Sequence, residues 1–270
     1  MQTVERETNG VRGPVVDASR AGNGMGLRVA LLFDEDPDLV EHLNPALAAA
    51  ARRRVVAPVH HLCRGSWEPE REGDAGDILG LLVLDGLLVR HVDIARRRAA
   101  ELVGAGDLIC PRYELGAVES TLPARVSWSV VEPVRAAVID EAVQAAVRSL
   151  PGVINELFGR AVKRAGAVTA QRVITRLPRL DARLLFLLWQ LADRWGRRSA
   201  DCVRLPLPLT HELLSDLASA NRAAVSRALG RLSEAGLVSK HDGYWKLHGS
   251  PPIDESAAAP QVGAVAVRES

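Results

Sequence analysis

The chain of 270 residues contains few of the residues that mark a disulfide-rich, metal-binding or membrane protein. Its three cysteines, Cys63, Cys110 and Cys202, are too few and too widely spaced for a disulfide framework or a zinc motif. An iron–sulfur cluster normally takes four thiolates. The seven histidines include no His-x-x-x-His pair, no apolar run reaches membrane-spanning length, and no signal peptide is evident. We therefore expect a cytoplasmic protein with reduced thiols, no metal site and no membrane partner.

The sequence also lacks the patterns that identify an enzyme. Serine, histidine and acidic residues are present, but no spacing brings a nucleophile next to a base or pairs two carboxylates. We therefore predict no catalytic residue, identify no cofactor, and expect that the protein is not an enzyme.

Bulk charge does not indicate a partner, because the formal net charge is only +1. Its distribution is more informative. Residues 149–248 carry 16 Lys/Arg and 8 Asp/Glu, a net charge of +8, so the rest of the chain carries −7. A basic C-terminal half joined to an acidic N-terminal half is typical of a sensor joined to a DNA-binding domain.

The length and the changes in pattern predict an α+β protein with two domains and a linking helix. Residues 1–26 are polar and show no periodicity, so we interpret them as a flexible leader. We assign residues 27–148 to a β-rich sensor domain, 149–177 to a long helix, and 178–249 to a DNA-binding domain. The Ala/Pro/Ser-rich residues 250–270 are expected to form a disordered tail.

Residues 210–247 hold the clearest local signals. Thr210 and Asn221 are residue types that cap helix N-termini, and each precedes apolar residues at helical spacing. Ser219-Ala220 predicts a short turn between the two helices, and Gly236 ends the second helix. This segment therefore predicts a helix-turn-helix.

A β-hairpin is predicted directly after the second helix, because Asp242-Gly243 joins two short runs of strand-forming residues. Together these elements form a winged helix-turn-helix pattern. The second helix carries small and polar residues on its exposed face, which are Arg222, Ala223, Ser226, Arg227 and Gly230. The DNA major groove admits one helix, and an arginine fork fits guanine O6 and N7. We expect double-stranded DNA as the partner, in preference to a small helical bundle whose arginines are only solvated.

The segment 52–138 predicts many short strands separated by glycine-containing turns, which is typical of a small β-roll or barrel. Asp85-Gly86 and Glu132-Pro133 are two of the predicted turns. Each would divide an apolar run into a pair of short strands.

An alternative for this half is the phosphoacceptor domain of a phosphorelay receiver. Asp34, Asp36 and Asp85 follow short apolar runs, as the acids of such a domain do. Two features argue against this alternative. The chain has no lysine before Lys163, and an aspartate within a tight Asp-Gly turn serves its own backbone.

The linking helix carries one apolar stripe, formed by Ile154, Leu157, Phe158, Ala161, Ala165 and Val168. Such a helix can pack on the roll or against its twin in a second chain. We favour a homodimer, because helix-turn-helix proteins usually contact two half-sites related by a twofold axis.

The order of β-roll, long helix and winged helix-turn-helix resembles the Crp/Fnr family of bacterial transcription regulators. The resemblance covers about residues 39–247 and is sharpest over 210–243. It implies a cyclic-nucleotide-binding-like roll that senses an effector, and a long helix that forms the dimer. It also implies a second helix that enters the major groove, with RNA polymerase as a further partner.

The same resemblance assigns DNA contacts residue by residue. Arg222 and Arg227 match the base-reading arginines of the family, and Ala223 falls where many members have a base-reading glutamate. Alanine cannot accept a hydrogen bond from cytosine, but it can contact a thymine methyl group. Positions that contact phosphate or lie near it correspond to Thr210, His211, Asn221, Lys240 and His241. Ser226 lies on the same exposed face.

The sensor half departs further from the family pattern. The segment 104–109, with Gly106-Asp107, resembles the entry to the phosphate-binding cassette, but it continues with Cys110-Pro111-Arg112 in place of Gly-Glu-Leu. Arg125 falls where the phosphate-binding arginine should be, and Ser127 follows it. The predicted effector pocket therefore contains Gly106, Asp107, Arg125 and Ser127. Because proline also lacks an N–H group, we predict that cyclic AMP is not bound in the usual way and that any effector is a different small molecule.

A third hypothesis keeps the roll as a small-molecule or partner-binding domain and gives the winged module a protein partner. A gel shift with genomic fragments at a stated salt concentration distinguishes it from DNA binding.

Overall fold

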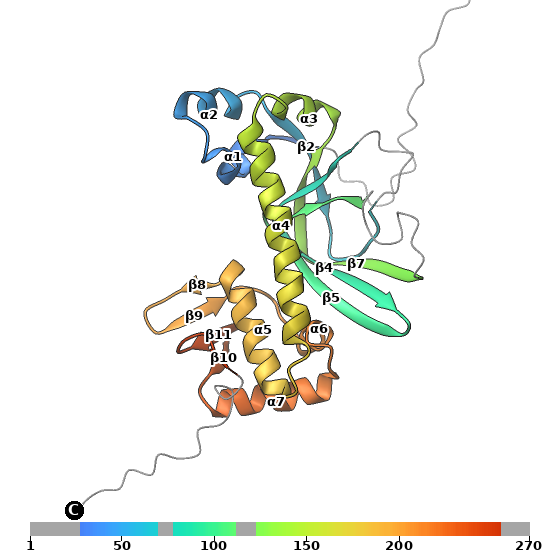
Figure 1. Cartoon of the computed structure of the whole chain (residues 1–270), viewed down its shortest axis with the longest axis vertical. Helices are drawn as coiled ribbons and strands as arrows, with labels where there is room; N and C mark the ends of the chain where they lie inside the picture. The colour runs from blue at the N-terminus through green and yellow to red at the C-terminus, as the bar shows by residue number, and fades with distance from the viewer. Residues whose placement is uncertain (1–27, 70–77, 112–122, 255–270) are drawn as a thin grey trace, which may run out of the picture.

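The computed structural model describes residues 28–69, 78–111 and 123–254. Figure 1 shows a β-roll with short helices packed at one end, a long helix beside it, and a smaller domain made of helices and a sheet. The predicted α+β class is confirmed.

The N-terminal part is built mainly of strands. Its elements are β1 (Arg28–Leu31), α1 (Leu32–Glu35), η2 (Pro37–Val40), α2 (Pro45–Arg52), β2 (Val56–Leu62), β3 (Gly65–Trp67), β4 (Gly80–Ile94), β5 (Arg97–Gly104), β6 (Leu108–Ile109), β7 (Ala124–Ile139) and α3 (Glu141–Val147). The strands form one sheet in the order β1-β2-β7-β4-β5, with β3 paired to β7 and β6 to β4. Trp128 lies in the buried core of this roll, where it packs edge-on against Trp67 at 5.7 Å.

The C-terminal part is mainly helical. Its elements are α4 (Pro151–Ile174), α5 (Leu180–Trp195), β8 (Arg197–Arg198), β9 (Cys202–Leu205), α6 (His211–Leu217), α7 (Arg222–Glu234), β10 (Val238–His241) and β11 (Tyr244–His248). The four strands pair in the order β10-β11-β9-β8. The predicted helix-turn-helix and its wing are therefore both present.

The predicted hairpin turns at Asp85-Gly86 and Glu132-Pro133 are wrong. Both dipeptides lie inside single long strands, β4 and β7, which pair with each other in antiparallel fashion and shift register around residues 83–88. Gly86 has φ +93°, and a Cβ there would lie 2.2 Å from the carbonyl oxygen of Pro133. The Asp-Gly signal is therefore a β-bulge where two strands approach closely, since glycine serves that geometry as readily as it serves a turn.

The turn between β4 and β5 lies instead at Ala95-Arg96. Both residues adopt positive φ, +47° and +62°, which is the backbone of a two-residue type I′ hairpin. Neither residue is glycine, asparagine or aspartate, so the usual sequence signal for this turn is missing.

The receiver alternative is excluded by the sheet and by the partners of its acids. Every strand pair described in the N-terminal sheet is antiparallel, whereas a doubly wound sheet is mostly parallel. Asp85 accepts a hydrogen bond from Arg135 at 2.9 Å, and Asp36 is paired with Arg160. Within the described residues, no group of three or more acidic, histidine or cysteine side chains could hold a metal ion.

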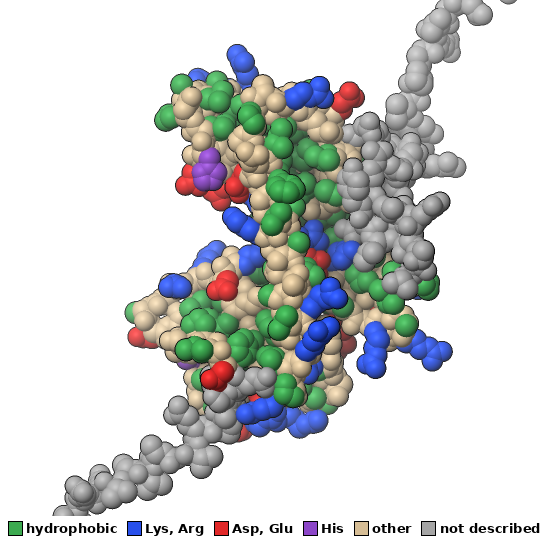
Figure 2. Space-filling view, in the orientation of Figure 1, with side chains coloured by type: hydrophobic (Ala, Val, Ile, Leu, Met, Phe, Trp, Pro, Cys, Tyr) green, Lys and Arg blue, Asp and Glu red, His purple; other side chains and the backbone are tan. Residues whose placement is uncertain are grey.

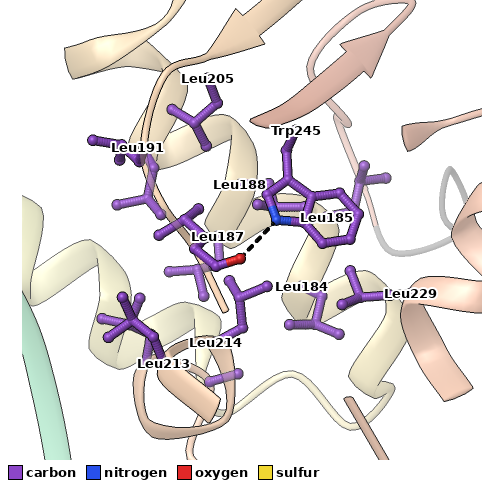
Figure 3. Close-up of a cluster of buried hydrophobic side chains, with 14 of the residues drawn as sticks. Leu184, Leu185, Leu187, Leu188, Leu191, Leu205, Leu213, Leu214, Leu229 and Trp245 are labelled. Carbon is purple, nitrogen blue, oxygen red and sulfur yellow. Dashed lines mark hydrogen bonds between the residues drawn. The ribbon is translucent and has the colours of Figure 1, made fainter. Parts of the chain in front are cut away.

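Helix α5 forms the centre of the C-terminal domain (Figure 3). Leu184, Leu187 and Leu188 are all at most 1% exposed, and they pack against side chains of α6, α7 and β9. Trp245 of β11 closes this core, and its indole N–H donates to the carbonyl oxygen of Leu209 at 3.1 Å. The wing is therefore held to the helices by packing and by a buried hydrogen bond.

The same core continues across the domain boundary. Leu87, Val89, Ala100 and Leu102 of β4 and β5 belong to one buried cluster with the leucines of α5. At the boundary, Gln171 of α4 donates to the carbonyl oxygens of both Ala100 and Leu217, at 2.9 and 3.0 Å. The β4/β5 hairpin is thus part of the support of the C-terminal domain.

Candidate nucleic-acid interface

Two capped helix N-termini position the helix-turn-helix. The Thr210 hydroxyl accepts from the backbone N–H of Leu213 at 3.1 Å, and the Asn221 side chain accepts from that of Ala224 at 2.8 Å. The turn between the helices passes through Ser219 at φ +50°. Each cap satisfies one free N–H group and leaves the positive end of the helix toward solvent. The predicted caps and the predicted turn are confirmed.

Helix α7 has one buried face and one exposed face. Val225, Ala228, Leu229 and Leu232 are at most 3% exposed. Arg222, Ala223 and Arg227 are exposed, and Figure 2 shows Lys and Arg side chains gathered along the lower edge of the molecule, where Figure 1 places α7. The exposed face therefore presents basic side chains and one small residue on a rigid support.

Arg222 is free to reorient. Its nearest carboxylate, Glu212, lies 3.9 Å away, and the side chains are 72% and 71% exposed. An ion pair so exposed contributes little and is screened by salt. Arg222 can therefore leave Glu212 at little cost when it binds a base or a phosphate.

The wing is a two-residue hairpin, as predicted. Asp242 and Gly243 have φ +49° and +83°, and β10 and β11 pair from Val238↔Leu247 to His241↔Tyr244. The Lys240 ammonium lies 5.2 Å from the centroid of the Trp245 ring. His241 lies 2.7 Å from the carboxylate of Asp242. Of the two predicted wing contacts, Lys240 thus rests on the domain core, whereas His241 contacts the turn.

His211 and Ser226, both predicted DNA contacts, also bond to each other. His211 Nδ1 lies 2.7 Å from Ser226 Oγ, and the imidazole stacks on Trp245 at 6.2 Å. The serine hydroxyl donates to the carbonyl oxygen of Arg222 at 3.1 Å, so its lone pair accepts from Nδ1–H. Burial lowers the pKa of His211, and nearby Lys240 and Arg222 lower it further. His211 thus joins the first helix, the recognition helix and the wing.

The long helix α4 carries an exposed apolar stripe. Ile154, Phe158 and Val162 are 46%, 70% and 54% exposed, and Ala161 and Ala165 are exposed beside them. Figure 2 shows apolar side chains along the upper part of this helix. Four of these residues, Ile154, Phe158, Ala161 and Ala165, were predicted to form the dimer helix, and Val162 was not.

One member of the predicted dimer stripe does not belong to it. Leu157 is 8% exposed and lies in the core formed with Phe33, Leu39 and Val147. Val168 is only partly exposed. Consecutive helical residues point about 100° apart, so a wide apolar stripe can face two partners. Leu157 faces the core of its own chain, whereas Phe158 faces solvent.

The structure does not assemble the predicted effector pocket. Gly106 and Asp107 lie beside Val83, with Gly106 N–H donating to the Val83 carbonyl oxygen at 2.8 Å, whereas Arg125 pairs with Asp93 in the register of β7 on β4. Val83 and Asp93 are ten residues apart on β4, and ten residues along a strand span roughly 30 Å. Gly106 and Asp107 therefore lie far from Arg125 and Ser127.

The orientation of the strand confirms this correction. Side chains alternate between the two faces of a strand, and Trp128 of β7 is buried in the roll. Arg125 and Ser127 are both exposed, so they point away from the interior. Arg112 of the predicted cassette lies outside the described residues.

Sequence reasoning missed an ion pair between the two domains whose carboxylate is buried. The Arg194 guanidinium on α5 contacts the Asp107 carboxylate at 2.5 Å, and the Asp107 side chain is 3% exposed. Arg164 of α4 similarly donates to Glu101 at 2.6 Å. These partners are 87 and 63 residues apart in the chain, so no local signal connects them.

Comparison with known proteins agrees with this architecture. A family model described as the Crp-like helix-turn-helix domain matches residues 182–248. The regulatory protein CysR of Synechococcus elongatus is 35% identical over 72 residues, which cover 26% of this chain and 35% of CysR. A CRP-like cAMP-activated global transcriptional regulator of Mycobacterium tuberculosis is 25% identical over 172 residues, which cover 62% of this chain and 74% of that protein. The chain thus matches about a third of one relative and three quarters of the other.

Solved structures share the fold. A CRP-family transcriptional regulator from Thermus thermophilus superposes with a TM-score of 0.51 at 20% identity, covering 74% of this chain and 94% of that one. A mutant of CooA from Carboxydothermus hydrogenoformans gives 0.53 at 16% identity, covering 71% and 83%. Among the described residues, no helix is long and apolar enough to span a bilayer.

A β-roll, a long exposed helix and a winged helix-turn-helix with a basic exposed face define a DNA-binding regulator. Residues 182–248 match the Crp-like helix-turn-helix domain, and the chain is similar over a larger part of its length to regulators of the Crp family.

Proposed function

We propose that the protein is a homodimeric, sequence-specific DNA-binding transcription regulator, without enzymatic activity, that acts in the cytoplasm, where bacterial DNA lies. The observation that carries this proposal is the two-faced helix α7, whose buried stripe fixes it on the domain while Arg222, Ala223 and Arg227 face solvent. A helix held in this way can enter the major groove without losing its packing.

The spacing of the two arginines sets what they read. Arg227 lies five residue steps after Arg222, which is about 7.5 Å along the helix axis. That distance corresponds to roughly two base-pair steps of B-DNA. Each guanidinium can therefore read its own guanine by a bidentate contact. Ala223 between them provides no acceptor, and it favours a thymine methyl group over a cytosine amino group.

Phosphate contacts surround this face. The N-terminus of α6 at Thr210 and that of α7 at Asn221 each present free backbone N–H groups, which suit phosphate oxygens. Lys240 and His241 of the wing, with His211, complete the proposed phosphate contacts. These contacts fix the register of the protein on DNA and do not read sequence.

The dimer is supported by the exposed stripe of α4. Ile154, Phe158, Ala161 and Ala165 lie on one side of the helix and contact nothing that buries them within the described part of this chain. Packing α4 against its twin covers this stripe and places two copies of α7 on one side of the molecule. Two half-sites about one helical turn apart, near 34 Å, are then contacted together.

The proposed regulatory input is a small molecule that binds the roll. We propose that cyclic AMP does not bind there in the way that is usual for the family. Cys110 and Pro111 occupy positions at which the family cassette has glycine and glutamate, and Pro111 offers no N–H to a phosphate. Arg125 faces away from the roll interior. In calorimetric titration, cyclic AMP should give no micromolar binding; binding that is lost in Arg125→Ala contradicts this proposal. RNA polymerase is a proposed further partner.

Substitution at the recognition face tests the DNA proposal. On a site selected from random DNA, Arg222→Ala and Arg227→Ala should each weaken binding by about 1–3 kcal/mol and relax base preference at one position per half-site. Arg198→Ala removes the same charge from an exposed residue of β8, away from α7, and should leave affinity within about threefold. Equal affinity of all three variants contradicts the groove assignment. Failure of the wild-type protein to bind any DNA favours a protein partner for the winged module.

A further inference from the structure

The turn between β5 and β6 is joined to the DNA-binding domain by an ion pair. Asp107, the last residue of this turn, is 2% exposed, and one of its carboxylate oxygens contacts Arg194 of α5 at 2.5 Å. The other oxygen accepts from the backbone N–H of Gly104 at 2.8 Å. We infer that Asp107 and Arg194 form a coupling element, through which movement of the turn before the cassette changes the position of the DNA-binding domain. This inference rests on the proposed regulatory function.

The position of the turn makes it suitable for this role. Residues 104–107 lie directly before β6 and Cys110, where the family-like cassette begins. The turn is held to the roll by two backbone hydrogen bonds of 2.8 Å, from Gly106 N–H to the Val83 carbonyl and from Val83 N–H to the Asp107 carbonyl. A ligand that shifts the cassette therefore has to move Asp107 or break these bonds.

The last turn of α5 contacts both ends of this β5–β6 turn, through Arg194 and Trp195. The Arg194 guanidinium stacks over the ring of Trp195 at 4.3 Å, which limits its orientations. The Trp195 ring itself packs on the backbone of Gly104, where a Cβ would lie 3.3 Å from the indole. The ion pair of Arg194 with Asp107 and the packing of Trp195 on Gly104 thus both join the end of α5 to the β5–β6 turn.

Helix α5 carries any displacement onward to the recognition helix. Its leucines share one buried core with Val225, Ala228 and Leu229 of α7, and close-packed elements move together because they cannot deform independently. Another polar contact between the roll and the helix-turn-helix, His91 to Asp216 of α6 at 3.2 Å, lies along the β4/β5 hairpin away from the cassette. Of these two contacts, the Asp107–Arg194 pair is therefore the one nearer to Cys110 and the family-like cassette.

The energetics favour two discrete arrangements. A carboxylate as buried as that of Asp107 is strongly disfavoured once its cation is removed. Separating the pair therefore requires the turn to move to where Asp107 gains water or another donor, and intermediate positions are unfavourable. An interface with two stable arrangements can convert a small shift into a domain movement.

Hydrogen exchange of the full-length protein, measured by mass spectrometry without DNA or effector, tests the coupling. Arg194→Met removes the cation and keeps an apolar side chain of similar length, and Asp107→Asn removes the anion and keeps an acceptor for Gly104. Coupling is reciprocal. Arg194→Met should speed exchange of the amides of residues 104–109, and Asp107→Asn should speed exchange at the end of α5, each by about fivefold or more.

The controls separate coupling from simple damage. Arg198→Met, which removes an exposed arginine of the same domain, should leave exchange at residues 104–109 unchanged. The double variant should exchange at about the rate of the faster single variant, because either substitution alone already breaks the contact. Changes confined to the mutated side, or additive changes in the double variant, overturn the inference. Since no DNA is present, these results do not depend on operator binding, and a failure of DNA binding leaves them standing.

Discussion

Leu157 and Phe158 are neighbours on α4 that serve different partners, and the difference predicts opposite results on truncation to alanine. Leu157 is 8% exposed and packs inside the chain, whereas Phe158 is 70% exposed. Burying the exposed part of Phe158, roughly 140 Å², contributes about 3.5 kcal/mol per copy in a dimer at about 25 cal/mol per Å². Because alanine retains part of that contact, Phe158→Ala should weaken dimerisation by at least about 100-fold.

Leu157→Ala should instead destabilise the fold. Removing a buried leucine side chain costs about 2–5 kcal/mol, depending on how far the site collapses. The dimerisation constant should change much less than in Phe158→Ala, since this side chain faces Phe33 and Leu39 of its own chain.

Sedimentation equilibrium gives the dimer constant of each variant, and urea unfolding at several protein concentrations gives stability. The concentration dependence of unfolding separates loss of association from loss of monomer stability. Equal weakening of the dimer by both substitutions refutes the division of the stripe. A wild-type protein that remains monomeric at high micromolar concentration refutes the role of α4 in dimerisation.

Three further predictions concern stability. His211 has a pKa below its usual 6.5 in the folded protein, so the unfolded chain takes up the proton first and the free energy of unfolding should fall as pH drops below 6.5. His211→Asn should reduce this pH dependence, measured by urea melts at about pH 7.5 and 5.5. The same pH dependence in the variant and the wild type contradicts the prediction. Gly86→Ala places a Cβ 2.2 Å from the carbonyl oxygen of Pro133 and should cost about 3 kcal/mol or more, whereas Gly230→Ala meets no neighbour within 4 Å and should stabilise α7 by about 0.5–1 kcal/mol; a tolerated Gly86→Ala argues against the bulge. Trp245→Phe leaves the buried carbonyl of Leu209 without its donor and should lower stability by about 1–3 kcal/mol, and a melting temperature equal to that of wild type contradicts the bond.

The sequence was most informative where structure is determined locally. The caps at Thr210 and Asn221 and the turn at Asp242-Gly243 involve groups within a few residues of each other, so residue type alone indicates the geometry. The family model covers this same region. The helix-turn-helix and its wing could therefore be predicted closely.

The roll depended on contacts between distant segments, and prediction failed there. The Asp85-Gly86 dipeptide fits a hairpin turn and a bulge equally well, and the choice depends on Pro133 of a strand 47 residues later. The turn that does exist, Ala95-Arg96, adopts positive φ without any of the residues that favour it. Its conformation is imposed by the long pairing of β4 with β5, which no local pattern reveals.

The candidate effector pocket failed for a related reason. Arg125 and Ser127 were placed by their position relative to a family motif, but a strand alternates its faces, and a shift of one residue reverses which side chains point inward. The buried Trp128 fixes the register and turns both residues outward. Asp107 was predicted as part of this pocket, but its carboxylate pairs with Arg194 of the other domain.

Selection of bound sites from random double-stranded DNA tests the central claim most directly. A dimer that places α7 in two successive major grooves should enrich an inverted repeat whose half-sites are centred about 10 base pairs apart. Each half-site should contain guanines at the positions read by Arg222 and Arg227, with thymine favoured over cytosine near Ala223. Enrichment of an unpaired half-site contradicts the dimer, and absence of any enriched sequence at physiological salt contradicts sequence-specific DNA binding itself.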